Sequence, residues 1–129
     1  MIKKFLPNVF LVIWALSALG ATIAHQFFTE RVAAASVWGM AAGWQREIGY
    51  FDLVLACTAL YSVFTRDSAL KKYLCMILPT LSILLGGNHL VTFWQSGQLL
   101  HFQWSALNGL AIIFGYASLF LLNTPEQKH

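Results

Sequence analysis

The stretch "YLCMILPTLSILLGGNHLVTF", residues 73 to 93, decides the fold, because it contains no charged side chain. A helix needs about 20 apolar residues to cross the roughly 30 Å hydrocarbon core of a bilayer. Only a helix satisfies every backbone donor and acceptor within one segment surrounded by lipid. The stretch therefore predicts a transmembrane helix that carries the strongly polar residues Asn88 and His89 close to one end.

Three further apolar runs of similar length accompany this one, at 5–24, 48–64 and 104–122. The chain is 58% hydrophobic and 10% charged, whereas soluble domains carry about 25% charged residues. The strands of a membrane β-barrel would be shorter and would alternate strictly. We therefore predict an all-α, polytopic membrane protein. Its single domain, 1–129, is expected to be an antiparallel four-transmembrane-helix bundle.

The first run has two interpretations. Lys3 and Lys4 precede it and small residues end it, as in a secretory signal. The apolar cores of signal peptides usually have about 7–15 residues, and this run is longer. We therefore expect an uncleaved first transmembrane helix.

The basic residues predict the orientation. Most of them precede the first run, separate the second run from the third, or follow the fourth. They are Lys3, Lys4, Arg66, Lys71, Lys72 and Lys128. The positive-inside rule then places both termini in the cytoplasm. The net charge of +3 is therefore interpreted as a topology signal, and we predict no nucleic-acid partner.

The outer connection between the first two helices, 25–47, is long and rich in alanine, and it carries Trp38 and Trp44. Tryptophan favours the membrane interface, so a short interfacial helix is expected in this segment. The other outer connection, 94–103, is bounded by Trp94 and Trp104. These two residues are typical of an aromatic belt.

With this orientation, the strongly polar groups of all four helices fall toward the outer end of the bundle. They are His25, Arg46, Glu47, Asp52, Asn88, His89, His101 and Asn108. A carboxylate at the bilayer centre costs about 2.5–3.5 kcal/mol on insertion scales, so Asp52 is expected to turn inward. His101, Ser105 and Asn108 share one helix face and are expected to point into the bundle. The pattern predicts an outward-facing polar pocket centred on Glu47 and His89.

Each of these residues has a structural alternative. Glu47 is either an inward site residue or the partner of Arg46 in an interfacial charge pair. His89 either binds a ligand or hydrogen-bonds a neighbouring helix, and Asn108 favours an interhelical contact. His25 and His101 are expected at the wet interface.

Several chemistries are compatible with this set of residues. Metal-ligand candidates are His25, Glu47, His89 and His101, although no tight ligand spacing supports them. Histidines on different helices also suggest a b-type haem. A quinone or lipid-headgroup pocket needs only a donor, a carboxylate and aromatic walls. No motif pairs a nucleophile with a base, which favours a protein that is not an enzyme.

Two short motifs carry a family resemblance. They are "EIGY" at 47–50, followed by Leu53, and "GGNH" at 86–89. The chain resembles the DoxX-like group of small four-helix bacterial inner-membrane proteins, in a branch with the patterns E-[IV]-G-[FY] and G-x-[GN]-H. The resemblance implies a multi-pass inner (plasma) membrane protein with an inward Glu and His. It also implies a link to quinone-related or thiol-redox systems.

Together these observations predict a small inner-membrane subunit that binds a ligand or a partner without catalysing a reaction. The expected partners are the lipid bilayer and either another membrane protein or further copies of the chain. A redox-active component that binds quinone, haem or metal is the alternative. A small transporter protomer is a second alternative.

Overall fold

The computed structural model describes residues 2–65 and 67–124, and the side chains from residue 5 onward. Within these residues the elements are five helices: α1 (Ile2–Phe27), α2 (Thr29–Ala34), α3 (Ala42–Phe64), α4 (Ser68–Ser96) and α5 (Leu99–Asn123). Four of them, all but α2, are long and apolar enough to cross a membrane. The prediction of an all-α membrane protein with four long helices is therefore confirmed. Arg66 and Lys128, which support the predicted orientation, lie outside the described residues.

The long helices extend beyond the predicted apolar runs, for local reasons. Asp67 caps α4, because its carboxylate accepts hydrogen bonds from the backbone N–H groups of Ala69 at 2.8 Å and Leu70 at 3.1 Å. Gly97, with φ of +69°, ends the same helix in the left-handed conformation that glycine favours. Only Gly97 and Gln98 separate α4 from α5. The residues predicted to form a longer loop, 94–103, are thus mostly helical.

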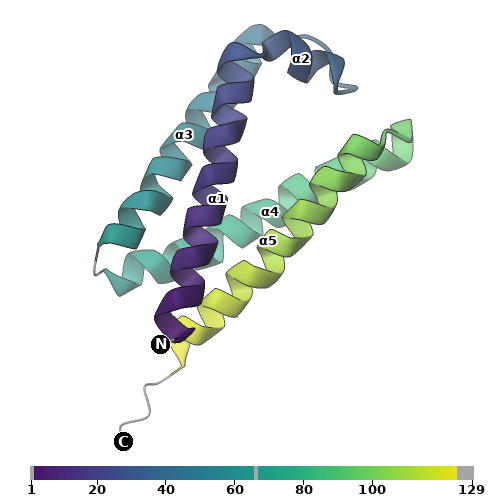
Figure 1. Cartoon of the computed structure of the whole chain (residues 1–129). Coiled ribbons are helices and arrows are strands. Elements are labelled where there is room, and N and C mark those ends of the chain that lie inside the picture. Colours follow the sequence, from purple (N-terminus) through teal and green to yellow (C-terminus); the bar gives the residue numbers. More distant parts are fainter. Residues whose placement is uncertain (1, 66, 125–129) are drawn as a thin grey trace, which may run out of the picture.

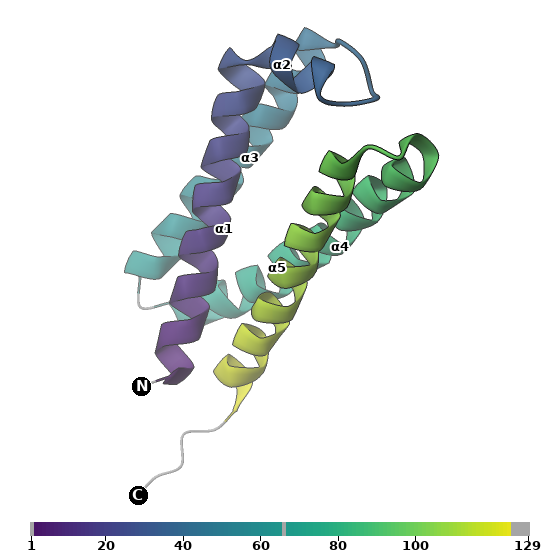
Figure 2. The ribbon, with the colours of Figure 1, turned by 45° about the vertical axis from the view of Figure 1, so that its right-hand side comes forward.

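The four long helices form two antiparallel pairs, α1 with α3 and α4 with α5 (Figure 1). The pairs meet near the ends that carry the termini and diverge toward the end that carries α2 (Figure 2). We call these the terminal end and the α2 end. The short 65–67 connection suggests that α3 and α4 are packed neighbours, but these two helices make few contacts. Each has its closely packed face against another helix.

Small and polar residues join α1 to α3. The Thr22 hydroxyl lies 3.2 Å from the Gly49 carbonyl oxygen, and the Gln26 amide donates to the Arg46 carbonyl at 2.8 Å. A Cβ atom at Gly49 would lie 2.7 Å from Gln26 Nε2 and 3.2 Å from His25 Cβ. Helices in lipid associate through such close packing and interhelical hydrogen bonds. Gly49 is therefore a position where α1 and α3 are closely packed at the α2 end.

The α4–α5 pair follows the same rule along a longer seam. A Cβ atom at Gly86 would lie 2.8 Å from Asn108 Cβ, and the Thr80 and Tyr116 hydroxyl groups are 2.9 Å apart. The α5 face predicted to point inward, from His101 through Ser105 and Asn108, is buried or half-buried. This face lies against α4.

The two pairs are joined at the terminal end. A Cβ atom at Gly115 of α5 would lie 2.8 Å from the Pro79 ring of α4 and 2.9 Å from Cζ of Phe10 of α1. Lys71 of α4 reaches the other pair as well, because its ammonium donates to Asn8 Oδ1 at 2.9 Å. Three helices thus meet at Gly115.

We predict that Gly115→Ala destabilises the protein by about 1–3 kcal/mol, because the added methyl group must displace a rigid proline ring. Reversible unfolding in mixed detergent micelles measures the change in free energy. Gly109→Ala on the same helix is the control. Nothing lies within 4 Å of a Cβ there, so the control should be neutral or stabilising, by up to about 1 kcal/mol. Equal effects of the two changes would contradict the packing described for Gly115.

Candidate functional site

Two histidines meet at the α2 end of the α4–α5 pair. His89 Nδ1 and His101 Nδ1 are 3.0 Å apart, a hydrogen-bonding distance. His101 is 2% exposed, and its Nε2 atom is buried without a partner among the described residues. His101 was expected at the wet interface, but α5 begins early enough to place it in the first helical turn, facing α4.

This contact fixes how protons are distributed in the pair. When both imidazoles are neutral, one Nδ1 donates and the other accepts. The donating ring then has a bare Nε2, and the accepting ring carries a proton on Nε2. The pair therefore presents one donor and one acceptor nitrogen, whichever tautomer is present.

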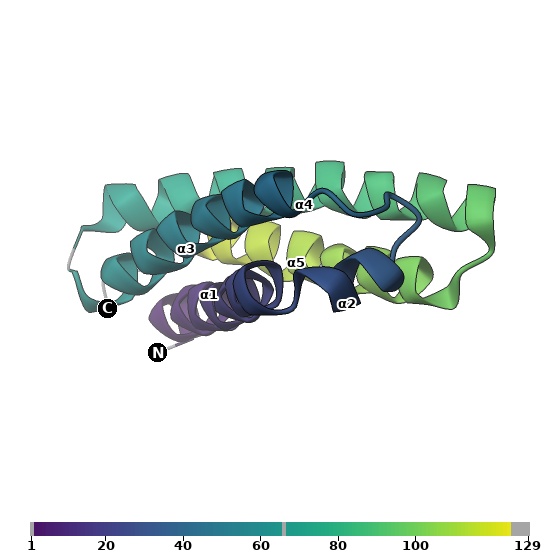
Figure 3. The ribbon, with the colours of Figure 1, turned by 90° about the horizontal axis from the view of Figure 1, so that it is seen from above.

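Trp38 brings the other helix pair to these histidines. Its ring centroid lies 5.4 Å from that of His89 and 5.2 Å from that of His101. Trp38 lies between α2 and α3. Together, α2 and the segment that follows it extend from the end of α1 toward α4 and α5 (Figure 3). Trp104 stacks on His89 with a centroid distance of 6.5 Å. We call these four residues, Trp38, His89, His101 and Trp104, the imidazole cluster.

Other predicted site residues lie elsewhere. Glu47, Arg46 and Asn88 are exposed. Gln45 and Gly49 occupy the buried face of α3, and Glu47 is two residues from each, which turns it by about 200° around the helix. The inward position expected for Glu47 is therefore not observed.

Asp52 and His25 are half-buried, and the His25 Nδ1 atom is enclosed without a partner among the described residues. Within residues 2–65 and 67–124, no three His, Cys, Asp or Glu side chains are placed to share a metal ion. The four metal-ligand candidates therefore do not form one site.

The histidine pair also does not fit a haem. Two axial imidazoles lie on opposite sides of the iron, roughly 4 Å apart, at twice a metal–nitrogen bond of about 2 Å. His89 and His101 instead bond directly to each other at 3.0 Å.

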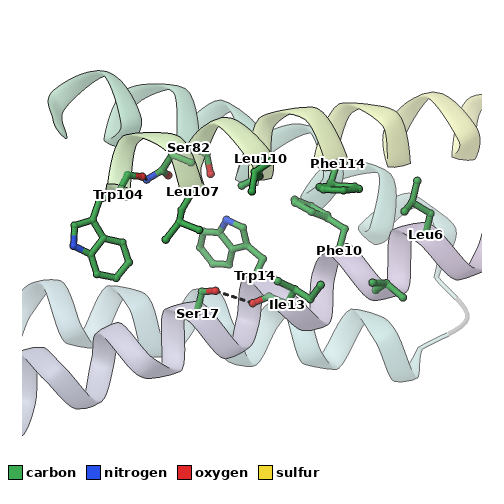
Figure 4. A pocket seen from close by; sticks show the side chains of 13 residues that line it. Leu6, Phe10, Ile13, Trp14, Ser17, Ser82, Trp104, Leu107, Leu110 and Phe114 are labelled. Atoms are coloured by element: carbon green, nitrogen blue, oxygen red, sulfur yellow. Dashed lines mark hydrogen bonds between the residues drawn. The ribbon is translucent and has the colours of Figure 1, made fainter. Parts of the chain in front are cut away.

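A pocket of about 440 Å³ lies between α1 and α5, where the two pairs begin to diverge (Figure 4). Its walls are mainly apolar, with Phe10 and Trp14 on one side and Leu110 and Phe114 on the other. Ile13, another lining residue, is 59% exposed, so the pocket opens toward the surroundings of the helices. We call this pocket the α1–α5 slot.

The slot adjoins the imidazole cluster through Trp104, which lines the slot and also stacks on His89. Asn108, another predicted site residue, lines the slot as well. Its amide nitrogen donates to the Trp104 carbonyl at 2.9 Å. Asn108 also packs against α4, since a Cβ atom at Gly86 would lie 2.8 Å from Asn108 Cβ.

Sequence reasoning missed the residues of the slot, above all Trp14, Ser17 and Ser82. One signal was present for Ser82, because Ser82, Gly86 and His89 follow the i, i+4, i+7 spacing of one helix face. No comparable signal marks Trp14, which looks like any aromatic residue of a lipid-facing helix.

No protein-family model, curated protein or solved structure matches the chain. The geometry of the slot and the imidazole cluster is therefore the basis for assigning a function.

We predict that Trp38→Ala and His89→Ala are coupled by about 0.5–1.5 kcal/mol in a double-mutant cycle, as contacting aromatic rings are. The free energy of unfolding in micelles is measured for the wild type, the two single variants and the double variant. Trp44→Ala with His89→Ala is the control, since Trp44 is 67% exposed. This control pair should be additive within about 0.5 kcal/mol. Additivity of the Trp38 pair would mean that Trp38 does not rest on the histidines.

Proposed function

We propose that this membrane protein is a non-enzymatic subunit that binds a lipid-soluble ligand in the α1–α5 slot. The observation that carries the proposal is a largely apolar cavity that opens sideways between two helix pairs. Its volume, about 440 Å³, falls within the usual range for small-molecule sites, about 300–1,000 Å³. A few polar groups in apolar walls are also typical of such sites.

The imidazole cluster supports the proposal from one end of the slot. A ligand whose tail lies along Phe10 and Leu110 places its other end near Trp104 and the histidine pair. Because His101 Nε2 is enclosed, His89 Nε2 is the nitrogen of the pair that is left for a ligand, as a donor or an acceptor according to the tautomer. The proposal of a role without catalysis rests on the sequence, which pairs no nucleophile with a base.

A second candidate is a redox component that binds a lipid-soluble quinone in the same slot. The observation that favours it is the position of the imidazole pair beside an apolar channel, since a quinone carbonyl accepts a hydrogen bond from an N–H group. Organic extraction and an oxidised-minus-reduced ultraviolet spectrum of the purified protein distinguish this candidate from a redox-inert lipid.

We further propose that the chain shares its architecture with the DoxX-like group of the bacterial inner membrane. In this proposal the glycines of the two motifs, Gly49 and Gly86, serve as close-packing positions in this chain and in the DoxX-like group. Both would clash with a neighbouring helix if they carried a Cβ atom.

We predict that Ala111→Phe reduces the amount of co-purifying lipid-soluble ligand by about tenfold, because Ala111 lines the slot and a phenyl ring fills it. Mass spectrometry of lipids extracted after gentle solubilisation measures the change. Ala106→Phe, at an exposed position of the same helix that does not line the slot, is the matched control. Identical lipid profiles for the two variants would rule out the slot as the binding site.

The proposed orientation, with both termini cytoplasmic, has its own test. In a Cys57→Ala, Cys75→Ala background, Gln98→Cys should react with a membrane-impermeant maleimide in intact cells. Ser68→Cys, at the opposite end of α4, should react only after permeabilisation. The reverse pattern would invert the topology, and labelling of both from one side would contradict a membrane-spanning α4.

A further inference from the structure

Ser82 is a buried polar residue that the packing of the helices does not explain. It is 1% exposed, yet it lines the α1–α5 slot. The hydroxyl groups of Thr80 and Ser118 donate to carbonyl groups of their own helices. The Ser82 hydroxyl has no such partner among the described residues. A hydroxyl group without a protein partner on the wall of a largely apolar cavity offers a hydrogen bond to a ligand in that cavity, so its position points to a ligand.

Two further hydrogen-bonding groups face the same part of the slot. Asn108 uses its amide nitrogen for the Trp104 carbonyl, which leaves its side-chain oxygen as an acceptor. The indole nitrogen of Trp14, on the facing wall, is turned toward the α4–α5 side (Figure 4). The slot thus offers a hydroxyl, an amide oxygen and an indole N–H. None of its lining residues is charged.

The depth of Ser82 restricts the ligand further. Ser82 is the midpoint of α4, which spans Ser68–Ser96, so it lies about 21 Å along the helix from either end. A charged headgroup would have to leave water and reach the middle of the bilayer to meet this hydroxyl, which is unfavourable. A neutral polar group carries a much smaller desolvation cost.

We infer that the ligand of the slot is an uncharged amphiphile, whose hydroxyl or carbonyl group bonds to Ser82 and Asn108 while its hydrocarbon part lies along α1 and α5. This inference rests on the slot proposed above as a binding site. Neutral glycerolipids, long-chain alcohols and lipid-soluble quinones share the required chemistry.

Native mass spectrometry of the full chain in detergent tests this with two lipids that have the same tails, dioleoylglycerol and dioleoyl phosphatidic acid. Dioleoylglycerol should bind at least about tenfold more tightly. Ser82→Ala should weaken its binding by roughly fivefold, the effect of one hydrogen bond. Ser82→Cys keeps the volume of the side chain and should weaken binding in the same direction.

Ser17→Ala is the matched control, because Ser17 also lines the slot but donates its hydroxyl to the Ile13 carbonyl at 3.0 Å. Equal or tighter binding of phosphatidic acid would overturn the inference, and so would equal effects of Ser82→Ala and Ser17→Ala. A long-chain alcohol and a quinone are measured in the same assay to distinguish the three ligand types. The compound that binds most tightly, and whose binding is weakened by Ser82→Ala, identifies the chemical class of the ligand.

The Ala111→Phe variant separates this inference from the proposed function. If Ala111→Phe abolishes binding of both lipids while Ser82→Ala changes neither, the slot binds hydrocarbon tails and the preference for a neutral head is wrong. If Ala111→Phe leaves both lipids bound as in the wild type, the slot itself is not the site.

Discussion

The contact of Phe10 and Pro79 with the backbone at Gly115 is the constraint on which the rest of the structure depends. It brings α1, α4 and α5 together at the terminal end, within the distances that a glycine alone allows. Because the two pairs are fixed there and diverge toward α2, a space opens between α1 and α5. The slot exists for this reason, and Trp38 is the residue that reaches across the open end to the histidines.

Each helix pair joins two long helices that follow each other in the chain, but α3 and α4 also follow each other and make few contacts, so order in the chain alone does not determine the pairing. Lipid tails are as apolar as leucine, so helices in a bilayer gain little from burying apolar side chains against one another. Close backbone approach at Gly49 and Gly86 then decides which helices pair. This explains why α3 and α4, joined by a short connection, make few contacts, whereas α1 and α3, separated by α2, are packed closely.

The helices and the α5 inner face could be predicted from the sequence, because hydropathy and helical spacing are local properties. His101, Ser105 and Asn108 could be placed on one face in this way. The side that Glu47 faces could not, because it depends on Gly49 packing against α1, a contact between distant segments. The slot could not be predicted from the sequence either, since its volume comes from the angle between the two helix pairs. Ser82 was missed as well, although its i, i+7 spacing to His89 is a local signal that places both residues on one face of α4.

The imidazole cluster and the slot are parts of one arrangement. Trp104 lines the slot and stacks on His89, so a ligand that moves Trp104 also changes the surroundings of the histidine pair. Trp38 contacts the same pair from the α1–α3 side, so any widening of the angle between the pairs withdraws it. The histidine pair therefore lies between two tryptophans, Trp104, which also lines the slot, and Trp38, which belongs to the α1–α3 side.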